Sequence, residues 1–235
     1  MRFLSHHEVC GALERGALRA GLPLRHTQGF NPHPILSLPA PRPVGVSGQD
    51  ELLILSLESP LPPQDVLSAL NAQAPPGVRF LSAAPLTGSR VPRPQRADYR
   101  LVLTRDQVAP VQAHVEGLKA NPTWPVERKV RVAGRRRGEP MGVRMIDIKP
   151  MIAGLSLEGD TLRWSVVPQG DAWARPGEVL ALLDLPQTHL ADVVRTAVCC
   201  SGDAGAPHPW ERNGSPYGPP DEQTKNGGHP CRNEC

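Results

Sequence analysis

The sequence has few aromatic residues and no long apolar run. Phe, Trp and Tyr make up 4% of its 235 residues. Its most apolar stretches, such as residues 52–57, are far shorter than the roughly 20 residues that a helix needs to cross a bilayer. The residues after Met1 do not form the apolar core of a signal peptide. We therefore expect a cytoplasmic protein that has no membrane partner.

The sequence also lacks the motifs of common cofactor and catalytic sites. It has no phosphate-binding loop, no dinucleotide-binding glycine run and no nucleophile elbow. A Cys-x3-Cys-x2-Cys run, which would hold the iron-sulfur cluster of a radical S-adenosylmethionine (SAM) enzyme, is absent as well. We expect no cofactor of its own and no independent catalytic activity.

The histidines and cysteines offer only a weak metal signal. Four of the five cysteines crowd at the end of the chain, which is not a disulfide framework, so reduced thiols are expected. Near the start, His6, His7, Cys10, His26 and His33 could converge on an ion. The favoured interpretation has the histidines bonding loop carbonyls and Cys10 packing as a small hydrophobe. We predict no metal site.

Local patterns predict an α+β fold. Ser5 and Glu8 form a capping box that predicts a helix over residues 6–20. Strands are expected at 35–38, 51–57 and 78–84, with a helix beginning at Pro63. If residues 1–4 are the stub of a further strand, the first half is a βαββαβ unit, the ferredoxin-like arrangement.

The second half repeats this pattern of strands and helices. Strands are expected at residues 99–103, 127–132, 143–148, 156–157 and 162–167, with helices at 106–118 and 176–183. We predict two ferredoxin-like lobes with antiparallel sheets, at residues 1–84 and 97–198, joined by a linker at 85–96. Residues 199–235 are rich in Gly, Pro, Asn and charge, and this composition predicts a disordered tail.

One segment of the second lobe is strongly basic. Residues 128–149 hold eight Lys and Arg residues against two acidic ones. Such a cluster is either a solvated hairpin tip or a surface that neutralises phosphates. The candidate anion-binding or nucleic-acid-binding residues are Arg128, Lys129, Arg131, Arg135, Arg136 and Arg137.

The loop after the first helix has an unusual arrangement of proline and glycine residues. Residues 27–34 read TQGFNPHP, where two prolines hold the residues before them extended and Gly29 permits a tight turn. This loop, RFLSH at 2–6, PVGV at 43–46, IDIKPMI at 146–152 and ARPGEVL at 174–180 are similar to the motifs of the radical-SAM-linked protein family. The resemblance runs from Met1 to about Val198. The chain departs from the family in having His7-Glu8-Val9 where Leu-Asp-Leu is usual.

The resemblance implies that the chain works with a partner enzyme, and it assigns no catalytic step to the chain itself. Members of that family are fused to, or encoded beside, a radical SAM enzyme, which brings its own cluster and S-adenosylmethionine. The chain would present substrate to that enzyme or steady it. The residues that carry the motif are the candidate partner-binding residues. They are Ser5, His6, Glu8, Gly29, Phe30, Asn31 and His33.

Two other functions stay open. Paired ferredoxin-like lobes with a basic hairpin also describe RNA-binding and RNA-modifying proteins, although no Gly-Arg-Thr-Asp run supplies a catalytic aspartate. The third possibility is a structural adaptor whose Phe30 loop binds a partner by burying the aromatic ring.

Overall fold

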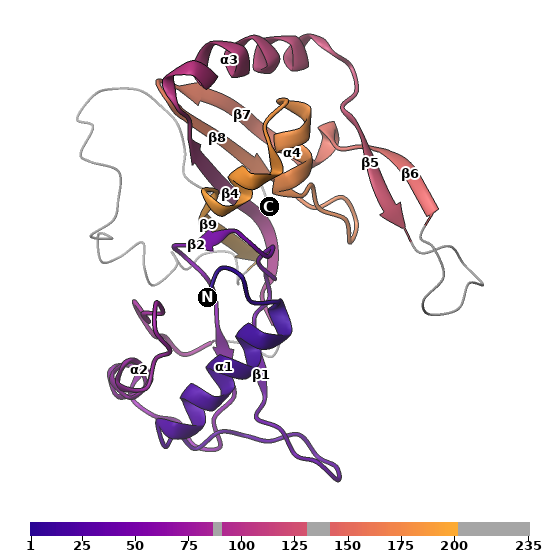
Figure 1. Ribbon diagram of the computed structural model, residues 1–235. Helices are drawn as coiled ribbons and strands as arrows, with labels where there is room; N and C mark the ends of the chain where they lie inside the picture. The colour runs from indigo at the N-terminus through magenta and orange to yellow at the C-terminus, as the bar shows by residue number, and fades with distance from the viewer. Residues whose placement is uncertain (87–90, 131–141, 202–235) are drawn as a thin grey trace.

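The computed structural model describes residues 1–86, 91–130 and 142–201, and they form two bodies of mixed α+β structure (Figure 1). The N-terminal body contains two helices and a two-stranded sheet, β1-β3. Its elements are α1 (His6–Arg19), β1 (Leu36–Ser37), β3 (Ile54–Leu55) and α2 (Pro63–Ala72).

The C-terminal body is built on a five-stranded sheet of order β2-β9-β4-β8-β7, in which only the β2-β9 pair is parallel. From β4 onward the succession is β4-α3-β7-β8-α4-β9, with the hairpin β5-β6 inserted after α3. The elements are β2 (Ser47–Gly48), β4 (Arg93–Val102), α3 (Arg105–Ala120), β5 (Pro125–Val130), β6 (Gly142–Asp147), η1 (Lys149–Met151), β7 (Ile152–Glu158), β8 (Thr161–Val166), α4 (Pro176–Leu182), η2 (Gln187–Ala191) and β9 (Val194–Ser201).

Helices α3 and α4 cover one face of this sheet and form the main core with it. Tyr99 of β4 and Trp164 of β8 are cross-strand partners whose rings stack at 5.4 Å between centroids. Both are buried in one apolar cluster with Val115 of α3 and Leu180 of α4. Alternate residues of a strand point to opposite faces, so this core defines which side chains lie on the other face of the sheet.

The N-terminal body has a smaller core of its own. Ala17 of α1 and Leu70 of α2 are buried together with Leu22 and Leu24, which follow α1. Leu24 makes an isolated antiparallel bridge with Leu57, so the chain after the helix runs beside β3. This small cluster positions α1 and the loop that follows it.

Segment 40–51 joins the two bodies. Its strand β2 pairs with β9, where the Ser47 amide donates to the Val193 carbonyl at 3.0 Å. Arg195 of β9 is buried and donates to both carboxylate oxygens of Glu51 and to the carbonyl of Ala40. The segment is therefore part of the C-terminal sheet, although it lies early in the sequence.

Hairpin β5-β6 projects from the C-terminal body, to the right in Figure 1. Its base is fixed by the Trp124 amide, which donates to the Asp147 carboxylate at 2.7 Å, and by the Ile148 amide, which donates to the Trp124 carbonyl at 3.0 Å. On its inward face, Arg128 pairs with Glu178 of α4. These bonds orient the hairpin at the edge of the body.

The α+β class and most of the predicted elements are confirmed, but the two ferredoxin-like lobes are not. In the N-terminal body, residues 1–4 and 78–84 form no strand, and β2 leaves to pair with β9. The predicted strands of this half are therefore reduced to the two-residue partners β1 and β3. Short, proline-flanked segments pair poorly when no wider sheet is available to receive them.

The predicted domain limits fall within elements of the structure. Strand β4 begins at Arg93, inside the expected linker, and β9 runs to Ser201, past the start of the expected tail. Disorder was predicted for residues 199–235, and of these, residues 202–235 lie outside the described residues. In the described ranges, no helix has the length and apolarity that a membrane span requires.

Candidate partner-binding site

The TQGFNPHP loop is a hydrogen-bonded finger on the N-terminal body. The Thr27 amide donates to the His33 carbonyl at 2.8 Å, and the His33 amide donates to the Thr27 hydroxyl at 3.0 Å. Further from the tip, the Ile35 amide donates to the Arg25 carbonyl. The Arg25 amide in turn donates to the carbonyl of Ser56, the residue after β3. We call residues 25–35 the finger. Its stem is held in place by the small sheet.

The tip of the finger presents an aromatic side chain to solvent. Gly29 has φ of 139°, a backbone conformation that other L-residues rarely adopt. It directs Phe30 outward, and the ring has a relative exposure of 102%, meaning that it contacts almost nothing. Asn31 and His33 are exposed beside it. A large apolar ring held in water on an ordered turn has the form of a partner-binding anchor.

The start of α1 is ordered by its cap. The Ser5 amide and hydroxyl each donate to Glu8 at 2.7 Å, and the Glu8 amide donates back to the Ser5 hydroxyl at 3.4 Å. The hydroxyl and amide of Ser5 lower the pKa of Glu8, so the carboxylate stays ionised. The predicted capping box is confirmed. Ser5 and Glu8 therefore have a structural role whether or not they contact a partner.

The finger and α1 meet on one exposed side of the helix. His6 and Cys10, one turn apart, lie 3.6 Å from ring Nε2 to thiol Sγ. One turn further, Glu14 lies 3.9 Å from Nδ1 of His33, which makes an ion pair when the imidazole is protonated. The structure thus places His6 and His33 beside the same side of α1.

The polar side chains on this side of α1 include one thiol, that of Cys10. Burial raises the pKa of the Cys10 thiol, and the charge of Glu14 raises it further, so the thiol is neutral near pH 7 and a poor nucleophile. Over the residues that the structure describes, no three His, Cys, Asp or Glu side chains are close enough to share a metal ion. The site is polar, with one aromatic anchor.

The basic cluster is divided by the structure. Arg128, a candidate anion-binding residue, is buried, with its Nε 2.8 Å and its Nη2 2.7 Å from the two carboxylate oxygens of Glu178. Its guanidinium is committed to that pair and not open to a nucleic acid. Lys129 and Arg144 are exposed on the hairpin. Arg131, Arg135, Arg136 and Arg137 lie outside the described residues.

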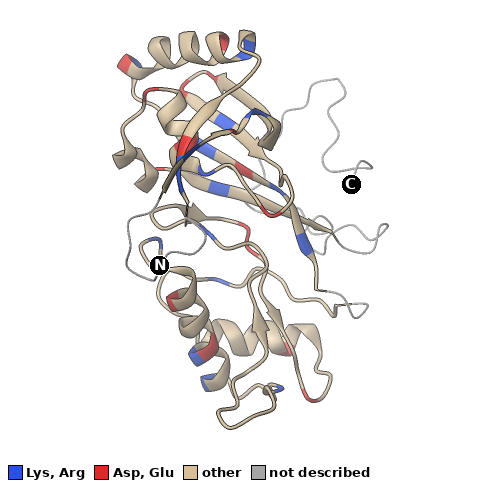
Figure 2. Ribbon diagram, turned by 90° about the vertical axis from the view of Figure 1, so that its right-hand side faces the viewer, with Lys and Arg blue, Asp and Glu red and all other residues tan. Residues whose placement is uncertain are grey.

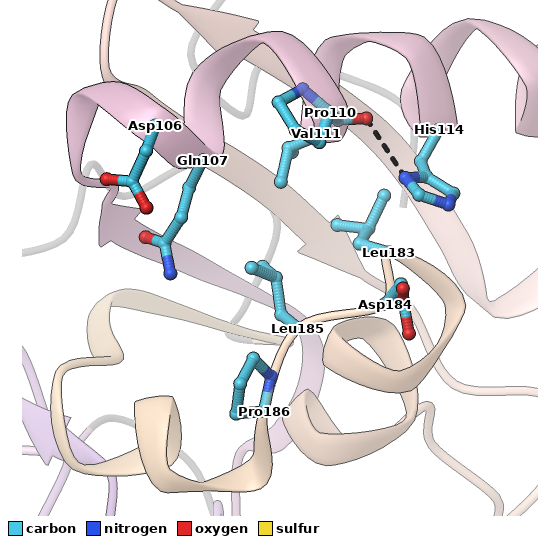
Figure 3. A pocket seen from close by; sticks show the side chains of 9 residues that line it. All are labelled: Asp106, Gln107, Pro110, Val111, His114, Leu183, Asp184, Leu185 and Pro186. Carbon is cyan, nitrogen blue, oxygen red and sulfur yellow. Dashed lines mark hydrogen bonds between the residues drawn. The ribbon is translucent and has the colours of Figure 1, made fainter.

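A hollow of about 140 Å³ lies elsewhere, between α3 and the chain after α4 (Figure 3). Val111, Leu183 and Leu185 form its apolar lining, while Asp106 and His114 lie toward opposite ends. The ring of His114 is bonded through Nδ1 to the Pro110 carbonyl at 2.9 Å. Ligand pockets usually enclose about 300 Å³ or more. A second hollow, of about 410 Å³, adjoins it at His114, and its lining of Ala113, His114, Gly117, Leu118, Asn121 and Leu182 offers His114 as its one titratable side chain. The first hollow is too small, and the second too poor in polar groups, to displace the finger as the main candidate site.

The sequence patterns did not identify the arginines on the sheet face away from α3 and α4, nor the arginine that binds segment 40–51. Arg100, Arg163 and Arg195 are isolated in the sequence, and none lies in a recognisable motif. The alternation of Arg and apolar residues in β4 and β8 was the available signal, because it predicts strands with one polar face.

Comparison with known proteins places the chain in a family. No match to a curated protein was found. The model of one family, described as an uncharacterised protein conserved in bacteria (DUF2344), matches residues 1–176, which include α1, the finger and hairpin β5-β6. The protein therefore belongs to the DUF2344 family of uncharacterised bacterial proteins.

Proposed function

We propose that this chain is a non-catalytic companion of a radical SAM enzyme, to which it binds through the finger and the adjoining side of α1. The enzyme would contribute the iron-sulfur cluster and S-adenosylmethionine, and this chain would present or steady the substrate. The link to a radical SAM enzyme comes from the sequence motifs alone. The binding role comes from the geometry of the finger.

The observation that carries the binding role is the full exposure of Phe30 on an ordered turn. Leaving such a ring in water forgoes the roughly 2–3 kcal/mol that burial of a large apolar side chain contributes. The finger holds the ring outward in advance, so little conformational entropy is lost when a partner covers it. His33 and Glu14 would form the polar rim around that aromatic centre.

We also propose that the C-terminal body is a ferredoxin-like lobe with additions. The strand order β9-β4-β8-β7, all antiparallel, together with the succession β4-α3-β7-β8-α4-β9, supports this proposal. The additions are the inserted hairpin and the parallel edge strand β2. Such a lobe would leave one sheet face open for substrate.

The test is anaerobic co-purification of the tagged protein from its native host. We expect recovery of a protein whose sequence contains the Cys-x3-Cys-x2-Cys run, identified by mass spectrometry. Phe30→Ala should weaken that complex by about 30-fold, since an anchor residue typically contributes about 2 kcal/mol or more. Leu81→Ala, which truncates another exposed apolar side chain, is the matched control and should leave the affinity unchanged.

Two results would overturn the proposal. A partner without the cluster-binding run would contradict the radical SAM assignment while leaving the finger as a docking element. Equal binding by the wild-type protein and Phe30→Ala would remove the finger from the interface.

The alternative, an RNA-binding module acting through the basic hairpin, is favoured by one observation. Lys129 and Arg144 are both exposed on hairpin β5-β6, which projects from the body. Phosphate contacts by such residues would give binding that weakens steeply with salt. Replacing Arg135, Arg136 and Arg137 with Ala should then reduce RNA retention and flatten its salt dependence, and no change would contradict the RNA alternative.

A further inference from the structure

The five-stranded sheet has one face that no described element buries. Tyr99 and Leu101 of β4, and Leu162 and Trp164 of β8, point to the helices and are buried. The residues between them point the other way. None of the side chains on that opposite face is buried in the described structure. On strands β4, β8 and β7 they are Arg96, Asp98, Arg100 and Val102 of β4, Thr161, Arg163 and Ser165 of β8, and Ser156 and Glu158 of β7. We call this set the open face.

Two arginines lie directly opposite each other in the middle of the open face. Arg100 of β4 is the cross-strand partner of Arg163 of β8, and Ser156 of β7 is the next residue in that row. Side chains in such a pair start from Cβ atoms about 5 Å apart, and like charges so placed repel. Figure 2 shows Lys and Arg positions on the strands of this body, away from the hairpin.

The neighbouring acidic groups do not neutralise this pair. Asp98, in the next row, accepts from Arg96 Nε at 2.8 Å and from the Ser165 hydroxyl at 2.5 Å, so it is already committed. Glu158 lies 3.3 Å from Arg163, but both side chains are more than half exposed, and such surface pairs are weak. The Arg100 side chain has no hydrogen-bond or ion-pair partner among the described residues.

The chemistry of the open face fits an oxyanion. Two guanidinium groups supply forked donors that match the geometry of a phosphate, and Ser156 adds a hydroxyl beside them. Among the described residues the open face has no aromatic side chain on which a base could stack.

We propose that the open face binds a phosphate group, with the guanidinium groups of Arg100 and Arg163 donating to its oxygens. The site lies apart from the finger and does not depend on the identity of the protein partner. The phosphate could belong to the backbone of a single-stranded nucleic acid or to a phosphorylated small molecule. Both present the same oxygens to the two arginines, and the experiment separates them.

The experiment uses fluorescence anisotropy with a labelled 12-nucleotide single-stranded RNA and competition by pyrophosphate, at several salt concentrations. The variants are Arg100→Gln, Arg163→Gln and the double variant. Loss of a charged hydrogen bond should weaken binding about tenfold for each arginine. Each should also reduce the slope of log affinity against log salt by about 0.7.

Two controls keep the result specific. Arg105→Gln, an exposed arginine at the start of α3, removes the same charge from the helix side and should bind like the wild type. A melting curve confirms that each variant is folded.

The outcomes separate the sources. If pyrophosphate displaces RNA and its own binding requires both arginines, an isolated phosphate group suffices. If only RNA binding depends on the arginines, the ligand is a polymer. The proposal is overturned if the double variant binds both probes as the wild type does, or if the wild type binds neither.

Discussion

Arg128 and Glu178 are joined by two parallel hydrogen bonds, 2.8 and 2.7 Å long, although 50 residues separate them in the sequence. Both side chains are nearly buried, at 8% and 11% exposure. Glu178 also accepts from the Arg175 amide at 2.8 Å, so one carboxylate caps α4 and holds hairpin β5-β6. The pair connects the most prominent projection of the C-terminal body to its core.

Removing one partner of this pair should destabilise the fold strongly. Glu178→Ala leaves the Arg128 guanidinium buried without its counter-charge, which typically costs about 3–5 kcal/mol. Urea denaturation followed by circular dichroism measures the loss. Arg128→Met combined with Glu178→Leu should recover much of it, since a buried ion pair can be replaced by apolar side chains at little cost. A loss below about 1 kcal/mol for Glu178→Ala would mean that the pair is solvated.

Asp50 should make the protein less stable at neutral pH than at acid pH. Burial raises its pKa above the ordinary value, and the charge of Glu51 raises it further. The protonated form is therefore favoured by folding. This favourable contribution is complete below the unfolded pKa of about 3.9 and is lost as the pH rises through the folded value. Asp50→Asn should raise the urea midpoint at pH 7 but not below pH 4.

The control for that experiment is Asp171→Asn, in an exposed turn. It should show no such pH-dependent gain. If Asp50→Asn is neutral or destabilising at pH 7, the Asp50 carboxylate has a favourable partner in solution, and the expected sign is wrong.

Cys200 should react slowly with alkylating agents. Burial raises the pKa of its thiol to about 11, so only about one molecule in a thousand holds the reactive thiolate at pH 8. The rate of iodoacetamide modification at Cys200, followed by mass spectrometry of its peptide, should rise about tenfold per pH unit between pH 8 and pH 10. A rate that levels off near pH 9 would indicate a solvent-exposed thiol of ordinary pKa, about 8.5.

Arg100→Gln should stabilise the protein in the absence of ligand. The change relieves the repulsion from Arg163 directly opposite, which is worth about 0.2–1 kcal/mol. Thermal unfolding at low salt measures the gain, and added salt should shrink it, because the repulsion is screened. A lower melting temperature for Arg100→Gln would mean that Arg100 supports the fold, in which case the arginine pair is structural.

Much of the local structure could be predicted from the residues, and much of the site could not. The capping box at Ser5 and Glu8 correctly predicts the start of α1, and the strands expected at 156–157 and 162–167 form the β7-β8 hairpin. Strand β9 was not predicted, although the β-branched residues Val194, Thr196 and Val198 alternate along it, and its last residues, 199–201, were placed in the tail. Arg128 was predicted to be a surface residue because its buried partner lies far along the chain.

Local sequence signals suffice for the helices, the hairpin turns and the ordered finger, because caps, turns and proline restrictions act within a few neighbouring residues. Long-range packing places β2 in the C-terminal sheet, buries Arg128 while Lys129 stays exposed, and pairs Arg100 with Arg163. Each of these depends on partners tens of residues away or more. An arginine has the same local preferences in every case, and only the strand register and the packing select its neighbours.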